Sequence, residues 1–477
     1  FRTRYTIMVF SSEIFLFGFL PVTILGYYLI NPGYRNIFLL IMSLAFYAWG
    51  EPKFFPVLVI SILINYVFGL LVDKHRQKGY VKGILTLMVI FNLSIMFVFK
   101  YLDFTIANIN RIAGSELLAL RNIALPIGIS FFTFQAMSYV VDVYRGEPVQ
   151  KNPLNVGLYI TFFPQLIAGP IVRYETVAKE ISSRKESLSD FSTGLQRFCC
   201  GLAKKVIISN NLAVIADKVF DAADLSGYSV SIFWLGSIAY TLQIYFDFSG
   251  YSDMAIGLGK MFGFHFNENF NYPYTAASIT DFWRKWHISL STWFRDYVYI
   301  PLGGSRCSKW KSYRNLACVW ILTGIWHGAN WTFIFWGILY LILLVMEKST
   351  PILSWIKKSG VFAVCYRIFT LFCVNIAWVL FRADSLSGAG TYLASMFGIN
   401  RISWNNVLGT YMWRDAAVLL AVAAVLSCPV KRLLERAMGR MPMMTRIIQV
   451  FGSIFLLILS IAYMVRTSYD PFIYFNF

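Results

Sequence analysis

Two histidines in an otherwise apolar sequence have the chemistry to move protons near neutral pH. His327 stands near the middle of Leu316–Met346, a run of 31 residues without Asp, Glu, Lys or Arg. His287 stands in a segment rich in tryptophan and hydroxyl side chains. A neutral imidazole can take a proton from a hydroxyl group and return it to a leaving group, which is the step that acyl transfer to an alcohol requires. The pair therefore predicts acid–base chemistry without a metal or a covalent nucleophile.

A helix around His327 is expected to place polar and aromatic side chains beside it. Residues three and four positions apart share a helix face, so Thr323, Asn330 and Trp331 are expected next to the ring, with Trp326 adjoining it in sequence. The uncharged run is too long for one ordinary span, and it brings His327 to membrane depth, where an ionisable group is costly and a candidate for function. The alternative is a structural histidine that Thr323 or Asn330 holds between two helices.

A second expected helix positions His287. Ser278 and Asp281 have the spacing of a capping box and predict its start. The side chains expected on the face of His287 or beside it are Trp283, Arg284, Trp286, Leu290 and Ser291. The alternative is an interfacial helix without a catalytic role. The other two histidines, His75 in a cationic loop and His265 in a polar connector, are assigned to solvent or structure.

Two carboxylates, Asp247 and Asp253, end an apolar run before this segment. They are either proton-relay or ion-site groups of a translocator, or partners of the many arginines, and pairing is the favoured interpretation. The glycines at 257, 259 and 263 neither follow a strand nor open a nucleotide fold, so they do not indicate a phosphate loop. The seven cysteines form no CxxC pair and no ligand pattern with histidine, so neither a disulfide framework nor a zinc site is indicated.

The composition is typical of a polytopic membrane protein. Hydrophobic residues make up 57% of the chain and charged residues only 14%, against about 25% charged in soluble domains. Uncharged runs of bilayer length predict an all-α fold of about ten to twelve transmembrane helices in a single integral domain, residues 1–477. The net charge of +18 indicates cytoplasmic loops rather than a nucleic-acid surface. The cationic clusters within 74–82 and 431–446 are expected to be cytoplasmic, and counting the spans from each cluster to the chain end predicts both termini outside. Residues 173–205 are expected to be an amphipathic surface helix or a solvated connector.

Motifs spread over nearly the whole chain resemble the membrane-bound O-acyltransferase (MBOAT) family, within its bacterial alginate O-acetyltransferase group. They are the segments Met8–Phe17, Leu125–Gln135, Phe163–Pro170, Tyr245–Asp253, Asp281–His287, Gly324–Gly328 and Pro471–Phe475. The likeness begins at Met8, so residues 1–7 are expected to be an extension before the family start.

The resemblance implies a ring of tilted helices around a central funnel, with His327 as the catalytic histidine and His287 at a second active-site position that is Asn in other branches. It implies acetyl transfer from a cytoplasmic thioester, acetyl-CoA, with no bound cofactor, towards hydroxyl groups of an extracytoplasmic polysaccharide such as alginate. The implied partners are the lipid bilayer, an SGNH-type O-acetyltransferase and a polysaccharide synthesis and secretion complex. The implied location is the bacterial inner membrane.

On this basis His327 is expected to act as general base on the acceptor hydroxyl. His287, with Asn330 or tryptophan walls, is expected to position or polarise the thioester carbonyl. Two other classes stay open. A polysaccharide or ion translocator would depend on Asp247 and Asp253 and not on His327, whereas a scaffold for an envelope complex would tolerate replacement of both histidines. The sequence does not name the polymer.

Overall fold

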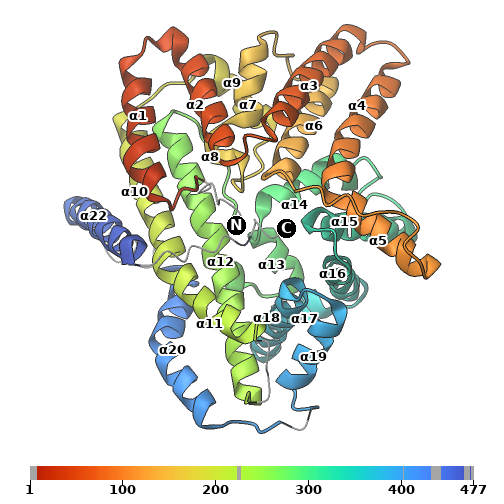
Figure 1. Cartoon of the computed structure of the whole chain (residues 1–477), viewed down its shortest axis with the longest axis vertical. Helices are drawn as coiled ribbons and strands as arrows, with labels where there is room; N and C mark the ends of the chain where they lie inside the picture. The colour runs from red at the N-terminus through yellow and green to blue at the C-terminus, as the bar shows by residue number, and fades with distance from the viewer. Residues whose placement is uncertain (1–7, 223–226, 401, 431–441, 467–472, 474–477) are drawn as a thin grey trace. The chain divides into compact units, whose positions relative to one another are not determined.

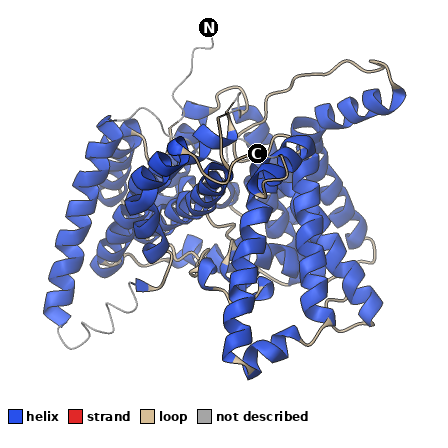
Figure 2. Cartoon of the chain, turned by 90° about the horizontal axis from the view of Figure 1, so that it is seen from below, coloured by secondary structure: helices blue, strands red, loops and turns tan. Residues whose placement is uncertain are grey.

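The computed structural model describes residues 8–222, 227–400, 402–430, 442–466 and 473, and every regular element in these ranges is a helix (Figures 1 and 2). The chain divides into two compact units. Unit 1 comprises residues 1–198 and 251–267, and unit 2 comprises residues 199–250 and 268–477. Helices α10 (Leu188–Ala203) and α12 (Val230–Met261) contribute to both units. The single integral domain expected from the sequence stays a prediction.

Unit 1 contains the helices of the N-terminal half. They are η1 (Ile14–Phe19), α1 (Leu20–Leu29), η2 (Pro32–Tyr34), α2 (Arg35–Gly50), α3 (Phe55–His75), α4 (Val81–Met96), η3 (Phe97–Tyr101), α5 (Leu102–Ala113), α6 (Ile129–Arg145), α7 (Pro153–Thr161), α8 (Phe163–Leu166) and α9 (Tyr174–Ser183), with the first part of α10 and the last part of α12. Helix α3 packs against α4, α6 and α7, and α2 packs against α7.

Unit 2 contains both histidines of interest. Its helices are the last part of α10, η4 (Lys204–Ser209), α11 (Asn210–Phe220), the first part of α12, η5 (Pro273–Thr275), α13 (Ile279–Lys285), α14 (Ile288–Phe294), η6 (Arg295–Tyr299), α15 (Lys309–His327), α16 (Trp331–Ser349), α17 (Ile352–Lys358), α18 (Gly360–Arg382), α19 (Leu386–Met396), α20 (Val407–Leu426) and α22 (Pro442–Arg466). Its core is dominated by large aromatic side chains from α13, α15, α16 and α18.

Seven helical stretches in the described residues are long and apolar enough to cross a bilayer. They are Phe55–His75, Val81–Ala113, Leu188–Phe220, Trp331–Ser349, Gly360–Arg382, Val407–Leu426 and Met443–Arg466, and a shorter apolar stretch spans Ile14–Leu29. The last of the seven has a mean hydropathy of 2.3 but only 6% of its window is buried. Such an exposed apolar surface suits lipid and not water. The all-α membrane fold is therefore confirmed, while the count of about ten to twelve spans stays a prediction.

The structure corrects the interpretation of residues 173–205 as one surface helix or a connector. Helix α9 is short and buries Tyr174, Val177 and Ile181. From Leu188 onward the chain instead forms part of a candidate span. The mixed Lys, Arg, Glu and Ser composition of this stretch indicated a surface position, but Lys205 is buried because a carboxylate neutralises it, as described below.

Two glycines allow α15 and α16 to pack with their backbones in contact. A Cβ atom at Gly324 would lie 2.5 Å from the carbonyl oxygen of Phe333, and one at Gly337 would lie 2.5 Å from the carbonyl oxygen of Trp320. Small residues at such crossings are the usual means of close helix packing in membranes. The α15–α16 pair is thereby fixed close to His327.

Gly324→Ala is expected to lower the free energy of unfolding by about 1–3 kcal/mol, the typical cost of overpacking. The added methyl group meets backbone atoms, which cannot rotate away. Thermal unfolding of the purified protein in detergent measures the effect. Gly452→Ala on α22 is the matched control, because nothing lies within 4 Å of a Cβ there. Equal melting temperatures for the two variants would contradict the close packing.

Candidate active site

His327 lies at the point where the long uncharged run breaks into two helices. Helix α15 ends at His327, Gly328 is extended, and α16 begins at Trp331. Asn330 caps α16, with its Oδ1 accepting a hydrogen bond from the Thr332 N–H at 3.1 Å. A run too long for one span is thus resolved by a short turn, and the histidine occupies the end of a helix.

This break overturns the expectation that Asn330 and Trp331 share a helix face with His327. Both residues belong to the start of the next helix, because asparagine is a preferred N-cap and the chain leaves the helical conformation at Gly328. The Asn330 amide also donates to the Asp384 carbonyl at 2.8 Å, and Trp331 is exposed. Thr323 is on the same helix as His327, but its hydroxyl donates to the Val319 carbonyl.

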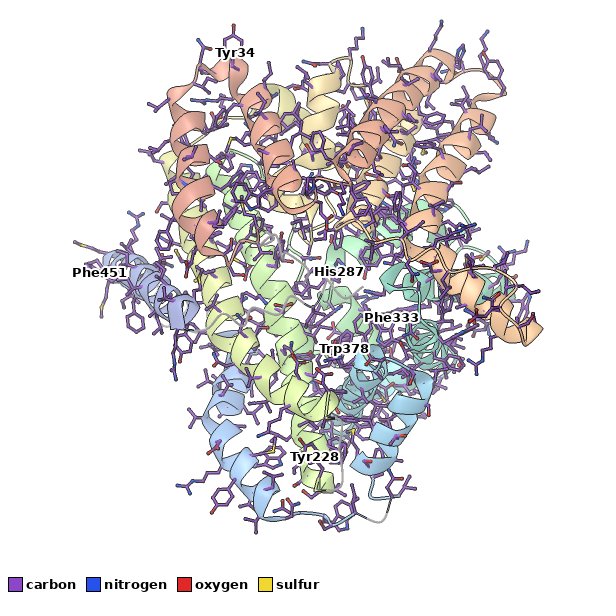
Figure 3. The ribbon with its side chains drawn as sticks, in the orientation of Figure 1. Tyr34, Tyr228, His287, Phe333, Trp378 and Phe451 are labelled. Atoms are coloured by element: carbon purple, nitrogen blue, oxygen red, sulfur yellow. The ribbon has the colours of Figure 1, made fainter. Side chains whose placement is uncertain are left out.

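Aromatic rings from three helices surround the His327 imidazole, which is only 6% exposed. The ring centroids of Trp326, Trp336 and Phe381 each lie 5.0 Å from it, and that of Phe333 lies 6.5 Å away. Figure 3 labels Phe333 in this part of unit 2. Trp326 was selected from the sequence, whereas the other three come from α16 and α18 and had no local pattern to reveal them.

The helix expected around His287 is also broken, and the break falls at the histidine itself. Helix α13 ends at Lys285 and α14 begins at Ile288. His287 has left-handed backbone angles, φ 43° and ψ 54°. The predicted start is confirmed, since the Ser278 hydroxyl accepts from the Asp281 N–H at 3.2 Å. The single helical face predicted for the neighbours of His287 is therefore wrong.

The neighbours predicted for His287 separate into two groups. Trp283 and Trp286 are buried in the aromatic core of unit 2, 5.6 Å from Trp336 and 4.8 Å from Trp378 between ring centroids. Figure 3 labels His287 and Trp378 in this region. Two other predicted neighbours face outward to a greater extent: the side chain of Arg284 is exposed and that of Ser291 is half-buried.

Asn269 holds one edge of the His287 ring. Its Oδ1 lies 3.1 Å from His287 Nδ1 and accepts hydrogen bonds from the N–H and hydroxyl of Ser289, at 3.2 and 2.9 Å. Because this oxygen accepts and cannot donate, Nδ1 carries the ring proton. His287 is 1% exposed, and its Nε2 is buried without a hydrogen-bond partner among the described residues.

Burial lowers the pKa of His287, which lies outside the candidate spans, to about 3. The ring is therefore neutral near pH 7, with a lone pair and no proton on Nε2. Polarising a thioester carbonyl through Nε2 would need a proton on that atom. This tautomer accepts a hydrogen bond there instead, which differs from the role expected from the sequence.

Trp326 connects the two histidines within one aromatic cluster of unit 2. Its ring centroid lies 5.0 Å from that of His327 and 6.1 Å from that of His287. The edge of Phe248 lies against His287 on another side, with 4.5 Å between centroids. The structure thus brings together the two side chains whose chemistry was singled out first.

Each of the two carboxylates on α12 has a cationic partner. Asp247 lies 2.6 Å from the Lys205 ammonium, with both side chains at most 2% exposed, and accepts from the Ile473 N–H at 3.1 Å. In unit 1, Asp253 accepts from two guanidinium nitrogens of Arg197 at 2.9 and 2.8 Å. This geometry favours the pairing interpretation over an ion site, with a lysine as one of the partners.

The two remaining histidines lie in unit 1 with ordinary polar partners. His75 Nδ1 is hydrogen-bonded to the Tyr80 hydroxyl at 2.7 Å. His265 lies 2.8 Å from Glu180, and its side chain is exposed. Their assignment to solvent or structure agrees with these contacts.

Glu347 is a buried carboxylate that the sequence analysis did not select. Its oxygens accept from the N–H groups of Ile279 and Thr280 at 2.7 and 2.8 Å, and from the Thr280 and Tyr366 hydroxyls at 2.6 and 3.0 Å. It thereby binds the start of α13, the helix that leads to His287. The sequence feature that could have indicated Glu347 is its position as the first charged residue after the uncharged run.

Glu347→Leu is expected to lower the free energy of unfolding by about 2–5 kcal/mol, because two buried N–H groups lose their acceptor. Glu347→Gln keeps the shape and one acceptor oxygen, so it should cost less than Glu347→Leu, although its NH2 group faces donors that the second carboxylate oxygen accepted from. Thermal unfolding in detergent measures both. The exposed residue Glu116 provides a control as Glu116→Gln. A Glu347→Leu variant as stable as the wild type would show that α13 is held by other contacts.

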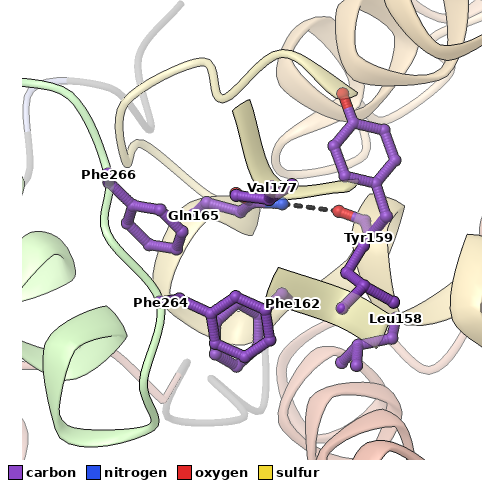
Figure 4. Close-up of a pocket in the computed structure, with 8 residues that line it drawn as sticks. Leu158, Tyr159, Phe162, Gln165, Val177, Phe264 and Phe266 are labelled. Atoms are coloured by element: carbon purple, nitrogen blue, oxygen red, sulfur yellow. Dashed lines mark hydrogen bonds between the residues drawn. The ribbon is translucent and has the colours of Figure 1, made fainter. Parts of the chain in front are cut away.

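A small pocket in unit 1 contains none of the predicted site residues (Figure 4). It is lined by Leu158, Tyr159, Phe162, Gln165, Val177, Ile181, Phe264 and Phe266. The Gln165 amide donates to the Tyr159 carbonyl across one wall. Within the described part of the chain, no group of three or more His, Cys, Asp or Glu side chains is placed to hold a metal ion.

The helices and the site together define a multi-pass α-helical membrane protein with two histidines buried at helix breaks. The chain belongs to the membrane-bound O-acyltransferase family, whose family model matches residues 41–386. It is therefore an O-acyltransferase, and the resemblance expected from the motifs is confirmed.

Known relatives cover most of the chain. It is 46% identical over 396 residues to the probable alginate O-acetylase AlgI of Pseudomonas syringae pv. tomato, which covers 82% of this chain and 75% of the relative. It is 38% identical over 433 residues to the peptidoglycan O-acetyltransferase of Helicobacter pylori, and this match covers 84% of this chain and 82% of the relative. The teichoic acid D-alanyltransferase of Bacillus subtilis is 28% identical over 276 residues, and this match covers 55% of this chain and 69% of the relative.

Proposed function

We propose that this protein moves an acetyl group from cytoplasmic acetyl-CoA towards hydroxyl groups of an extracytoplasmic polysaccharide of the alginate type. The relatives named for O-acetylation of alginate and of peptidoglycan, at 46% and 38% identity, support acetyl as the transferred group. The relative named for D-alanyl transfer is more distant, at 28%. The higher identity to the alginate enzymes supports the choice of polymer.

The observation that carries the proposal is the position of His327. An ionisable side chain is buried at a helix break inside an uncharged run, in ring contact with residues of α15, α16 and α18. Burying an ionisable group among apolar side chains is costly, and such groups are therefore candidates for function.

In the proposed reaction His327 acts as general base. It takes the proton of the acceptor hydroxyl while the hydroxyl oxygen attacks the thioester carbonyl carbon. The carbon–sulfur bond then breaks, the acetyl ester forms, and the leaving thiolate receives the proton from the imidazolium. The step is balanced by acetyl-CoA and the alcohol alone.

We place the protein in the bacterial inner membrane with both termini extracytoplasmic. The cations of residues 74–82 support a cytoplasmic position for that loop, while most of the second cluster, at 431–446, lies outside the described residues. The proposed partners on the acceptor side are an SGNH-type O-acetyltransferase and a polysaccharide synthesis and secretion complex.

Two measurements test the proposal. CoA release from acetyl-CoA is followed with the purified protein, and alkali-released acetate is measured on the envelope polysaccharide of cells that make it. The proposal expects both signals above those of a control without the protein. Transport in proteoliposomes without thioester consumption would support a translocator instead. Unchanged acetylation after replacement of both histidines would support a scaffold.

A further inference from the structure

The segment around Asn269 makes hydrogen bonds to both sides of the break at His287. The Asn269 carbonyl accepts from the Ile288 N–H at 2.9 Å, just after the histidine. The Asn271 N–H donates to the Lys285 carbonyl at 2.9 Å, just before it. The α13–α14 break is therefore held by this neighbouring segment rather than by its own local sequence.

The backbone of His287 requires such support. Its left-handed conformation is uncommon outside glycine, although histidine and asparagine adopt it more readily than most residues. Conformations of this kind persist where surrounding contacts over-determine them, and they concentrate at functional sites. Here the contacts come from Asn269, which is fully buried.

The imidazole ring itself is fixed on several sides. Phe270 stacks on it, with 6.4 Å between the ring centroids and 14° between the ring planes. Phe248 meets it edge-on, with 4.5 Å between centroids. Asn269 Oδ1 engages Nδ1, and Ser289 shares that oxygen. No charged group contributes to the pKa shift of His287, which comes from burial alone. One polar atom of the ring, Nε2, has no hydrogen-bond partner among the described residues.

We propose that Asn269 is a positioning residue that holds His287 with its proton on Nδ1, so that Nε2 accepts a hydrogen bond from an O–H or N–H group of a bound substrate. The inference rests on the proposed acetyl transfer for the identity of that substrate. The donating group is either a second hydroxyl of the acceptor, next to the one that loses its proton to His327, or an amide N–H of the pantetheine arm of acetyl-CoA. In both cases His287 binds a neutral hydrogen-bond donor and not the thioester carbonyl.

The tautomer can be measured without any assay of activity. The chain has only four histidines, so ¹⁵N-histidine labelling in lipid nanodiscs gives a spectrum that single His→Asn variants assign. We expect the His287 signals of a neutral ring protonated on Nδ1 in the wild type and in Ser289→Ala. In Asn269→Leu the proton should move to Nε2. A wild-type ring protonated on Nε2, or no change in Asn269→Leu, would overturn the proposal.

Asn269→Asp provides a second variant of nearly the same shape, should the leucine variant fail to fold. A carboxylate beside Nδ1 favours the charged ring and raises the pKa of His287. Only the neutral ring accepts a hydrogen bond, so CoA release should decline as the pH is lowered. In Asn269→Asp this decline should begin at a higher pH than in the wild type. An acidic limb that does not move would count against the proposal, whereas absence of CoA release in the wild type would count only against the proposed function.

Kinetics with acetyl-CoA distinguish the two sources of the donating group. If Nε2 binds the pantetheine amide, Asn269→Leu should raise KM for acetyl-CoA at least tenfold. If it binds a second hydroxyl of the acceptor, KM should stay within twofold while acetate on the polysaccharide falls at least tenfold. If KM and acetylation both remain at the wild-type level although the tautomer has changed, the proposal is wrong.

Discussion

His327→Ala is expected to reduce acetyl transfer by about 100- to 10,000-fold, the usual contribution of a general base. The variant removes the imidazole that would take the hydroxyl proton. We expect that His287 does not replace it, because Asn269 holds that ring through Nδ1 and its Nε2 is assigned to binding the substrate. CoA release by the purified protein and alkali-released acetate from cells with equal protein amounts measure the loss.

His75→Ala is the matched control for this prediction. It removes a histidine whose contact is with Tyr80 in unit 1, so both signals should remain at the wild-type level. Thermal unfolding of the two variants separates loss of chemistry from loss of folding. If His327→Ala is folded and acetylates normally, His327 is a structural histidine, and the translocator and scaffold interpretations take precedence.

Breaking the buried Lys205–Asp247 pair is expected to have the largest effect on stability. Asp247→Leu alone leaves an ammonium group buried, which typically costs about 3–5 kcal/mol. Both side chains are at most 2% exposed, so water cannot compensate for the missing charge. The carboxylate also accepts from the Ile473 N–H, and this bond is lost in the same variant. Unfolding in detergent, by heat or denaturant, measures the change.

The double variant Lys205→Met with Asp247→Leu is the decisive comparison. Replacing both members of a buried pair by apolar residues is often nearly neutral, so it should recover most of the stability. If the pair has only this structural role, CoA release should also recover. Loss of all function in a stable double variant would instead support the interpretation of Asp247 as part of an ion or proton pathway.

The membrane class and several local features could be predicted from the sequence because they depend on local composition. Uncharged runs predict helices of bilayer length, and the spacing of Ser278 and Asp281 predicts a helix start that the structure confirms. The stretch from Leu188 was predicted less well. Its mixed Lys, Arg, Glu and Ser composition indicated an amphipathic surface helix or a connector, whereas Lys205 is neutralised by a carboxylate 42 positions further along the chain, at Asp247.

The site residues could be selected from the sequence, but their arrangement could not. His327 and His287 stood out as ionisable groups among apolar ones. The break at His287 contains neither glycine nor proline, because contacts with Asn269 and Asn271 impose it from another segment. The role of Glu347 was hidden for the same reason, since its partners are backbone groups of Ile279 and Thr280.

The end of α15 at His327 also bears on the charge that forms during the reaction. Aligned peptide dipoles give the C-terminal end of a helix a partial negative charge, equivalent to about half an elementary charge. A base at that end becomes an imidazolium when it takes a proton, and the helix stabilises this cation by about 0.3–2 kcal/mol. Because His327 is buried, water screens this field little, and the backbone of α15 contributes a partial counter-charge that no side chain supplies. A histidine at the opposite end of such a helix would meet a partial positive charge and be a weaker base.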